Sequence, residues 1–465
     1  MWNRNEQTIC AISTPHGVGG IAVIRISGKE ALSICKKISK KLSKKSTVES
    51  HKAYFSDILD LEKNKVDETL ITYFAEGKSF TGEEVVEISC HGSRFITQQI
   101  LDLLIKCGCR IADKGEFTYR AFMNGKLDLV QAESVLSLIE SQNLASAKVA
   151  LRQLEGHISK EFEILISDLT WCLAHIEASI DFIEQGVEVV DQKVLISKLK
   201  GINQSLEKLI KSYQSGRLIK DGIKVALIGE PNVGKSSLLN MLLQNEKAIV
   251  TPIAGTTRDV IDGEIVFEGV KFNISDTAGL RETQDQVEII GIDKSKKEAE
   301  NADVLCFVLD CSQTDWERSL QLATQLKNTK KIFLLNKSDI ITKAEKNELL
   351  TKLGAMFDKV GTHKALPTTT ISGASREDIF KLVIESVGSI EYLNEAIISS
   401  SRQFEQAQDS FSAIERSLVE LENNMGAEFV AMYLKEALVS LQKILGQVYD
   451  DQIMDRIFKE FCLGK

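Results

Sequence analysis

Apolar side chains recur with a helical period in two long stretches of the chain. In residues 141–215 and 400–459 they return every three or four positions, as a helix with one buried face requires. The clearest run in the first stretch is Leu151, Leu154, Ile158, Phe162, Leu165 and Leu169. We therefore expect a helical bundle assembled from two segments that are distant in the sequence.

The stretch between these two segments, about 222–387, has a different pattern. Short apolar, strand-like runs occur at 224–228, 304–309 and 331–335, and helical patterns separate them. Such alternation is typical of a mostly parallel sheet covered by helices. We expect an α/β domain inserted into the helical domain.

The first 120 residues mix both patterns. Strand-like runs at 21–26 and 85–88 accompany helical segments near 30–40 and 94–106, which predicts an α+β domain. The whole chain is thus expected to be multidomain α/β and α+β. The predicted limits are 1–120 for the N-terminal domain, 121–218 and 386–465 for the two parts of the helical domain, and 219–385 for the inserted domain.

Composition narrows the function classes. The 465 residues are 43% hydrophobic and 26% charged, and no run of 18 apolar residues offers a membrane span. The first residues lack the apolar core of a secretory signal, so we expect a cytoplasmic protein. The nine cysteines contain no CxxC pair, which disfavours disulfides and zinc. The net charge of -9 argues against broad binding of nucleic acid but leaves a local basic patch open.

A phosphate-binding loop follows the first apolar run of the middle stretch. Residues 229–236 match GxxxxGK[ST] between a predicted strand and a predicted helix. Its glycines allow backbone N–H groups to surround phosphates, while Lys235 reaches the β- and γ-phosphates and Ser236 can bind magnesium. The residues predicted to contact the nucleotide here are Asn232, Val233, Gly234, Lys235, Ser236 and Ser237.

A second loop, 336–339, distinguishes guanine from adenine. It reads Asn336-Lys337-Ser338-Asp339 and follows an apolar run. The Asp339 carboxylate can accept hydrogen bonds from the ring N–H and the amine of guanine, whereas adenine would leave it partly unpaired. Asn336 is expected to brace the loop. The candidate for the last base-contacting loop is Ser372, Gly373 and Ala374. Together these loops predict GTP binding.

Two segments between these loops are candidate switches that sense the γ-phosphate. The Thr257 hydroxyl is expected to complete magnesium coordination, Asp276 to hold the ion through water, and the Gly279 N–H to meet the γ-phosphate. The switch residues predicted to contact GTP or its ions are Thr251, Thr256, Thr257, Asp276, Thr277, Ala278 and Gly279.

The residue that activates water is not evident from the second switch. Leu280 occupies the position where many GTPases have a glutamine that orients the attacking water, and leucine cannot do this. Nearby carboxylates offer substitutes, namely Glu282, Asp285 and Glu288. The residues alone leave the choice among the three open.

Along its whole length the chain resembles the MnmE (TrmE) family of tRNA modification GTPases. The resemblance rests on both switches, on N-terminal motifs at 14–20, 79–87 and 115–126, and on the C-terminal sequence 461–465. It implies an N-terminal domain that binds folate and forms a homodimer, a discontinuous helical domain, and an inserted Ras-like P-loop GTPase domain. His16 and Val18 depart from the proline and arginine common in the first motif.

The resemblance also implies roles for individual residues. Glu288 aligns with the glutamate that activates water, and Cys462 either acts in the modification chemistry or serves packing. Magnesium would be bound by Ser236 and Thr257, and a potassium ion that replaces an arginine finger by Asn232, Thr251, Ile253 and Thr256. A reduced folate, 5-formyl- or methylene-tetrahydrofolate, would be bound by Arg25, Glu87, Lys126 and Lys465.

The activity implied by the resemblance is the modification of certain tRNAs. With the flavoprotein MnmG, in a heterotetramer, the family installs carboxymethylaminomethyl or aminomethyl at C5 of the wobble uridine, U34. One alternative is a ribosome-assembly GTPase that acts as a GTP-gated RNA-binding switch, which calls for a GxxG clamp with basic flanks that does not stand out in this sequence. A second is a folate-dependent transferase with a dispensable nucleotide domain, which the intact GTPase motifs disfavour.

Overall fold

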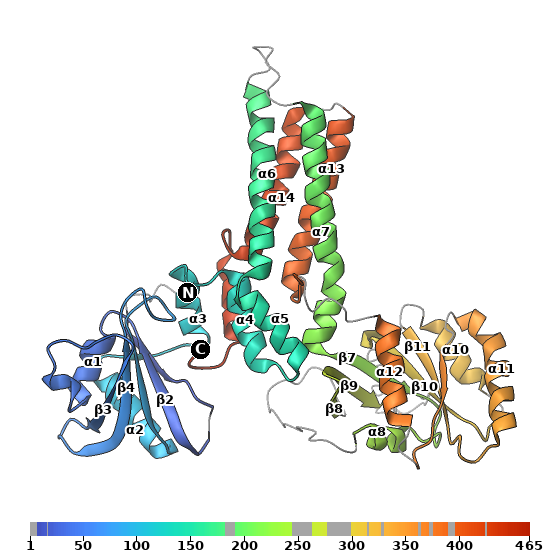
Figure 1. The fold of residues 1–465 in the computed structure, drawn as a ribbon, viewed down its shortest axis with the longest axis horizontal. Helices are drawn as coiled ribbons and strands as arrows, with labels where there is room; N and C mark the ends of the chain where they lie inside the picture. The colour runs from blue at the N-terminus through green and yellow to red at the C-terminus, as the bar shows by residue number, and fades with distance from the viewer. Residues whose placement is uncertain are drawn as a thin grey trace, which may run out of the picture. The chain divides into compact units, whose positions relative to one another are not determined.

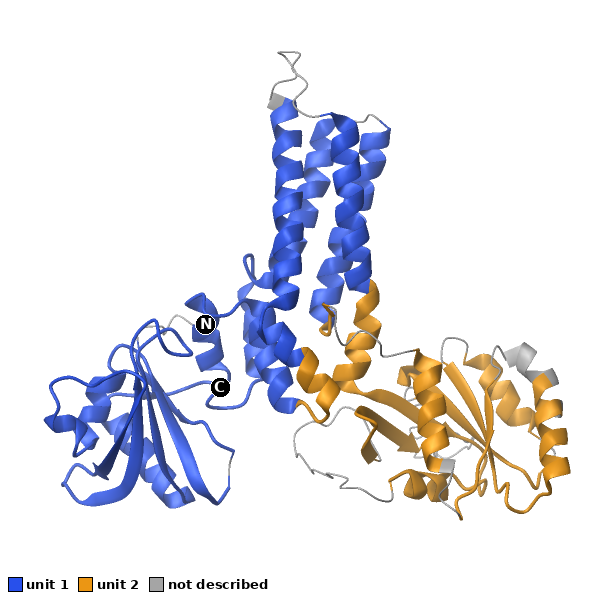
Figure 2. Cartoon of the chain, in the orientation of Figure 1, with its two compact units in different colours: residues 1–140, 150–210, 401–465 blue, residues 141–149, 211–400 orange. Residues whose placement is uncertain are grey.

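The computed structural model describes residues 7–15, 17–181, 191–243, 263–276, 299–313, 316–326, 330–360, 364–371, 375–388, 396–423 and 426–465. The chain forms two compact units, which Figure 2 distinguishes by colour. The first unit comprises residues 1–140, 150–210 and 401–465, and the second comprises 141–149 and 211–400. The domain limits expected from the sequence stay predictions.

The N-terminal part of the first unit contains a six-stranded sheet with the order β3-β4-β5-β2-β1-β6. Its strands are β1 (Ile9–Ile12), β2 (Gly19–Ser27), β3 (Lys52–Leu59), β4 (Lys65–Phe74), β5 (Val85–Gly92) and β6 (Arg110–Ile111). The pairs are antiparallel except for β1 with β6. The helices of this part are α1 (Ala31–Ile38), the short η1 (Leu42–Lys44) and α2 (Arg94–Lys106).

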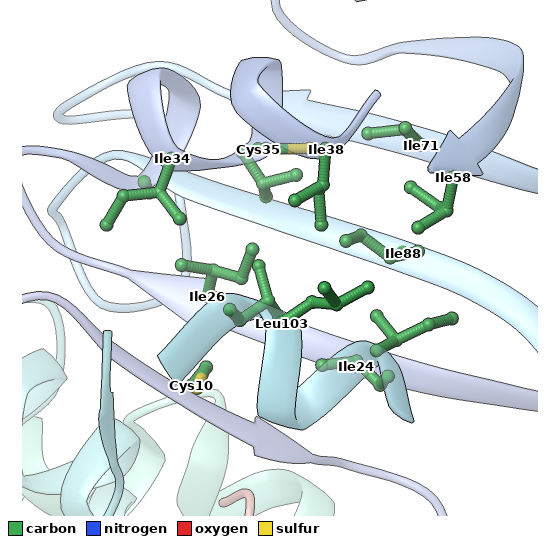
Figure 3. Packing of buried hydrophobic residues seen from close by; sticks show 14 of the residues in the cluster. Cys10, Ile24, Ile26, Ile34, Cys35, Ile38, Ile58, Ile71, Ile88 and Leu103 are labelled. Atoms are coloured by element: carbon green, nitrogen blue, oxygen red, sulfur yellow. The ribbon is translucent and has the colours of Figure 1, made fainter. Parts of the chain in front are cut away.

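The core of this part lies between the sheet and helices α1 and α2 (Figure 3). Alternate residues of each strand face the helices because successive side chains of a strand point to opposite faces. Ile24 and Ile26 of β2 are fully buried in this way. They meet side chains from both helices and from two further strands, namely Ile34, Ile38, Leu103, Ile71 and Ile88.

The rest of the first unit is helical. The helices are α3 (Glu116–Met123), α4 (Leu129–Glu140), α5 (Leu144–Leu154), α6 (His157–Asp181), α7 (Gln192–Asp221), α13 (Ser401–Glu422), α14 (Ala427–Leu445) and α15 (Asp451–Lys459), of which α5 and α7 continue into the second unit. Figure 1 shows α6, α7, α13 and α14 side by side. Ion pairs of α7 join it to α6 and α13, between Lys198 and Asp168 (2.6 Å) and between Lys200 and Glu422 (2.8 Å). The predicted bundle is confirmed.

All six residues of the predicted helical run lie in helices, but one of them does not face the core. Phe162, Leu165 and Leu169 of α6 are buried, but the Leu151 side chain in α5 is 46% exposed. Gly156 has φ +82°, a left-handed conformation that ends a helix, so α5 and α6 are separate helices. Because the run spans two helices, its apolar residues do not share a single face.

The second unit is a doubly covered α/β fold. Its sheet order is β12-β11-β10-β7-β9-β8, parallel except for the antiparallel pair of β8 with β9. Apolar clusters lie on both faces, which is why every residue of β10 is buried. The elements are β7 (Ile223–Ile228), α8 (Lys235–Leu243), β8 (Gly263–Phe267), β9 (Val270–Asp276), β10 (Val304–Asp310), α10 (Glu317–Gln325), β11 (Lys330–Asn336), α11 (Lys343–Val360), β12 (Ala365–Pro367) and α12 (Ser375–Val387).

This architecture confirms the expected fold class, which includes a Ras-like P-loop domain with a mostly parallel sheet. The three apolar runs of the middle stretch correspond to β7, β10 and β11. Among the helices of the described residues, none has both the length and the apolar content that crossing a membrane requires.

The segments that enter and leave the second unit are packed against each other. The chain enters along α7 and leaves through 396–400, and the Ile398 N–H donates to the Ser212 hydroxyl at 3.1 Å. A Cβ on Gly216 would lie 2.1 Å from the Ile398 carbonyl oxygen, so only glycine allows this approach. Ile219 and Ile397 join Val149 of α5 in an apolar cluster beside the crossing.

We predict that Gly216→Ala destabilises the protein by about 1–3 kcal/mol, because the backbone of Ile398 cannot yield to the added methyl group. The control is Gly201→Ala in the same helix, where a Cβ meets no atom of the described residues within 4 Å. That change should stabilise by about 0.5–1 kcal/mol through helix propensity. Denaturant unfolding measures the free energy of unfolding of both variants. Equal gains in stability would show that Gly216 and Ile398 are not tightly packed.

Candidate functional site

The predicted phosphate loop lies between β7 and α8, so its last residues form the N-terminus of a helix. The Lys235 ammonium donates to the carbonyls of Gly229 and Glu230, both at 2.9 Å. In the first turn of α8, the Ser236 hydroxyl donates to Asp276 Oδ2 at 3.2 Å. Because β9 pairs with β7, the end of β9 brings Asp276 to this position.

Close backbone approaches explain the two glycines of the loop. Gly234 has φ +96°, and a Cβ there would lie 2.4 Å from the side-chain nitrogen of Asn336. A Cβ on Gly229 would lie 2.5 Å from the Val308 carbonyl oxygen in β10. Only glycine at these positions lets the loop lie this close to Asn336 and β10, and a glycine-rich loop at the N-terminus of a helix suits a phosphate.

The guanine loop at the end of β11 is tied to the phosphate loop. The Asn336 amide donates to the Val233 carbonyl at 2.8 Å, and the Lys337 ammonium donates to the Asn232 carbonyl at 3.0 Å. Asn336 Oδ1 is buried and has no hydrogen-bond partner among the described residues. These bonds fix the distance between the part that holds phosphates and the part that reads the base.

Asp339, the candidate for reading guanine, lies two residues further along. Its Oδ1 accepts a hydrogen bond from the Thr369 hydroxyl at 2.7 Å. The Ser338 N–H donates to the Thr368 carbonyl at 3.0 Å, which anchors the loop to the segment after β12. The Asp339 carboxylate is thus oriented from outside the loop and can face a base.

The structure therefore brings together the predicted residues of both loops with Asp276, while Ser237 is exposed in the first turn of α8. The other predicted residues of the GTP and cation sites lie outside the described residues. They are Thr251, Ile253, Thr256, Thr257, Thr277, Ala278, Gly279, Glu288, Ser372, Gly373 and Ala374.

A second candidate site lies in the N-terminal part of the first unit. Arg25 on β2 and Glu87 on β5 are directly opposite in the antiparallel register, and Arg25 Nε donates to Glu87 Oε1 at 2.9 Å. The Arg25 guanidinium carbon lies 6.0 Å from the centre of the Phe80 ring and 5.7 Å from that of Phe117. An arginine–carboxylate pair whose guanidinium lies near two aromatic rings is suited to a flat, polar ligand.

The C-terminal residues Gly464 and Lys465 form hydrogen bonds with this site. Gly464 has φ +88°, and a Cβ would lie 2.4 Å from the Ile12 carbonyl oxygen. The Gly464 carbonyl accepts from the Ser13 hydroxyl at 3.1 Å and from Arg25 Nη1 at 3.5 Å. The Phe117 N–H donates to the Lys465 carbonyl at 3.3 Å. Lys465 is thereby held near Arg25 although the two are 440 positions apart in the sequence.

The position of Lys465 shifts its pKa. Burial lowers the pKa of its ammonium, and the charge of Arg25 lowers it further, against the opposing influence of Cys462 and Glu87. Cys462 itself is exposed. Lys126, the fourth predicted folate residue, donates to the Gly77 carbonyl at 2.5 Å, in the loop that also carries Phe80.

Sequence reasoning missed a buried charge network behind this site. The side chains of Arg120 and Glu116 in α3 are only 2% and 4% exposed, and they form an ion pair at 2.9 Å. Arg120 also contacts Glu83 at 3.0 Å. Burial alone would raise the pKa of Glu116, but hydrogen bonds from Arg110 and the Asp113 N–H, together with Arg120, hold it below its usual value. The spacing of Glu116 and Arg120 was the available signal, because residues four apart on a helix are neighbours.

The second unit's fold, its phosphate loop and its guanine loop together define a P-loop GTPase. Comparison with known proteins gives a narrower answer. A family model described as GTP-binding protein TrmE N-terminus matches residues 8–126, and one described as MnmE helical domain matches residues 129–462. The two models together account for almost the whole chain.

Relatives named tRNA modification GTPase MnmE match over their full length. The Bdellovibrio bacteriovorus protein is 48% identical over 100% of this chain and 98% of its own length. The Flavobacterium johnsoniae protein is 40% identical over 99% of this chain and 100% of its own length. The Clostridioides difficile protein is 38% identical over 99% of both chains. The chain belongs to the MnmE family of tRNA modification GTPases. It binds GTP and is a GTP hydrolase involved in tRNA modification, and the resemblance read from its motifs is confirmed.

We predict that Gly234→Ala lowers the affinity for GDP at least about tenfold, because the methyl group would displace Asn336 and strain the loop. Gly269→Ala in the turn between β8 and β9 is the matched control: its φ of +79° imposes similar strain, but a Cβ there meets nothing within 4 Å. The control should lose stability and keep its affinity. Equilibrium binding of a fluorescent GDP analogue measures this, and an unchanged affinity for Gly234→Ala would show that nucleotide binding does not depend on the close packing of Gly234 against Asn336.

Proposed function

We propose that this GTPase is activated by potassium and, with the flavoprotein MnmG, installs carboxymethylaminomethyl or aminomethyl at C5 of the wobble uridine U34, using a one-carbon unit from a reduced folate. The observation that carries the proposal is that one chain contains two separate prepared sites. One combines the phosphate and guanine loops, and the other combines Arg25, Glu87 and Lys465. A GTPase without further chemistry has no need of the second site.

In the GTP site, each residue has a role that its chemistry supports. Lys235 would neutralise the β- and γ-phosphates, and Asp339 would accept hydrogen bonds from guanine. The hydroxyl oxygens of Ser236 and Thr257 are the hard ligands that Mg²⁺ prefers, and Asp276, whose carboxylate lies 3.2 Å from the Ser236 hydroxyl, would hold the ion through water. Bound magnesium supplies charge that stabilises the phosphates during hydrolysis. The Glu288 carboxylate would orient the attacking water.

The potassium site would use the loops at either side of the phosphates. Asn232, with the left-handed φ of +62°, would contribute from the phosphate loop. The other ligands would be Thr251, Ile253 and Thr256. A monovalent cation there supplies the charge that an arginine finger supplies in other GTPases. Leu280, which cannot orient water, is consistent with a mechanism that relies on Glu288 and this cation.

We further propose a homodimer, in a heterotetramer with MnmG and in the cytoplasm, in which GTP brings two GTPase domains together. The movement would reach the folate sites through the helical domain. The continuous helix α7, which runs from the bundle into the second unit, supports this route. The division into an N-terminal domain (1–120), a GTPase domain (219–385) and a two-part helical domain is proposed on the same basis.

In the folate site, the charged groups match the ligand. The Glu87 carboxylate can accept hydrogen bonds from the amidine edge of a pterin, while Lys126 and Lys465 suit its carboxylates or ring carbonyls. Arg25 would hold Glu87 in place, since it donates to the carboxylate. We also propose a direct chemical role for Cys462, whose thiol is exposed and near Lys465.

The test of the GTPase mechanism is turnover in potassium against sodium buffer. We expect potassium to stimulate hydrolysis, Asn232→Ala to abolish the stimulation, and Glu288→Ala to remove turnover while GTP still binds. Turnover that is indifferent to the cation and survives Glu288→Ala would refute this mechanism, although the GTPase activity itself would stand.

The test of the folate site is calorimetric titration with 5-formyl-tetrahydrofolate. Glu87→Gln should weaken binding about tenfold or more, because a charged hydrogen-bond acceptor is worth about 1.5–3 kcal/mol. Asp57→Asn is the control, since it breaks ion pairs with Lys40 and Lys65 in the same sheet away from Arg25. A folded Glu87→Gln protein that binds as tightly as the control would exclude Glu87 from the site.

A further inference from the structure

A buried aspartate lies behind the guanine loop and has no role in the mechanism above. Asp310 is the last residue of β10, and its side chain is 3% exposed. Its Oδ1 accepts from the Ser312 N–H at 2.9 Å and from the Ser312 hydroxyl at 2.7 Å. Its Oδ2 accepts from the Lys337 ammonium at 2.6 Å. Both carboxylate oxygens therefore have defined partners.

The parallel sheet places this carboxylate beside the guanine loop. In the register of β10 with β11, Asp310 is opposite Asn336, and the Cys311 N–H donates to the Asn336 carbonyl at 3.0 Å. Parallel strands end at the same edge of a sheet, so Asp310 lies next to Lys337, the residue that follows β11. The contact is therefore set by the fold and not by a flexible loop.

Lys337 connects two strained backbones. Its ammonium donates to Asp310 and also to the carbonyl of Asn232 in the phosphate loop, at 3.0 Å. Asn232 has φ +62° and Lys337 has φ +60°. Residues other than glycine rarely adopt this conformation, and it persists only where surrounding contacts hold it. The double contact of the lysine is such a restraint.

The charge of Asp310 is maintained by its partners. Burial alone would raise the pKa of this carboxyl, but the hydrogen bonds from Lys337 and Ser312 outweigh burial and hold the pKa below its usual value. Asp310 is thus a carboxylate at neutral pH. Lys337 has a partly exposed side chain on a flexible four-carbon stem, and the buried Asp310 carboxylate restrains its ammonium beside the Asn232 carbonyl of the phosphate loop.

We propose that Asp310 is a positioning residue of the GTP site, which holds the Lys337 ammonium against the phosphate loop and so slows the release of the nucleotide. It does not choose the base. The candidate for that role is Asp339, whose carboxylate is oriented by Thr369, on the other side of the loop. Loss of Asp310 should therefore affect guanine and hypoxanthine nucleotides equally.

A purely structural role makes a different prediction. Asp310 also stabilises the turn after β10 through Ser312, and the Trp316 indole N–H donates to its carbonyl at 3.3 Å. If the turn were its purpose, weakening the turn would matter as much as losing the ion pair. Ser312→Ala removes the hydroxyl contact and leaves Lys337 in place, so it is the matched control.

The experiment measures the release of fluorescent GDP and IDP analogues from the full-length protein by stopped-flow displacement. We expect Asp310→Asn to speed the release of both about tenfold or more, and Ser312→Ala to stay within about twofold of the wild type. Lys337→Met should match Asp310→Asn. The double variant Asp310→Asn/Lys337→Met should be no faster than Lys337→Met alone, because residues that act through one contact are not additive.

Three results would overturn the proposal: equal acceleration by Ser312→Ala, additive effects in the double variant, or faster release of GDP without faster release of IDP. Thermal melting establishes that each variant is folded. If Asp310→Asn does not fold, Lys337→Arg and Lys337→Met test the contact from its other end. Slow release kept by Lys337→Arg and lost in Lys337→Met supports the ion pair, and equal rates overturn it.

Discussion

The parallel pairing of β7, β10 and β11 is the constraint on which the GTP site depends. It aligns the carboxyl ends of three buried strands at one edge of the sheet. The phosphate loop follows β7 there, the guanine loop follows β11, and Asp310 ends β10 between them. Because β10 is covered on both faces, this edge cannot shift without disturbing two apolar clusters. The hydrogen bonds from Asn336 and Lys337 to the phosphate loop then hold the two loops in the positions that the sheet gives them.

The N-terminal site obeys a different rule, since its parts come from distant segments. Antiparallel pairing places Arg25 opposite Glu87, but the third charged group, Lys465, comes from the C-terminal residues. Gly464 makes this possible, because its positive φ and missing side chain let the chain pass the Ile12 carbonyl. This site therefore forms only when residues near the two ends of the described chain come into contact. The described residues of the GTP site all belong to the second unit.

Much of the fold could be predicted because its signals are local. The apolar runs at 224–228, 304–309 and 331–335 became β7, β10 and β11 within one or two residues, and the loops that follow them contain fixed motifs. The misses needed tertiary information. Leu151 carried the right period but belongs to a separate helix.

The roles of Arg120 and Asp310 were missed for a related reason. Both are ordinary charged residues in the sequence, and only the structure reveals that they are buried and which partners neutralise them. Burial of a charge depends on what other segments contribute, and no periodicity within one segment records it.

The crossing of α7 with 396–400 has a consequence for how such a chain could fold. Ser212 and Ile398 are 186 positions apart in the sequence and yet joined by a hydrogen bond, so the whole GTPase insert starts and ends at one point. Once the insert has folded, its two ends lie as close together as the ends of a tight turn, so it connects the helices on either side in the same way. Because its ends lie together, the folded insert adds little chain entropy cost to closing the bundle, whatever its length.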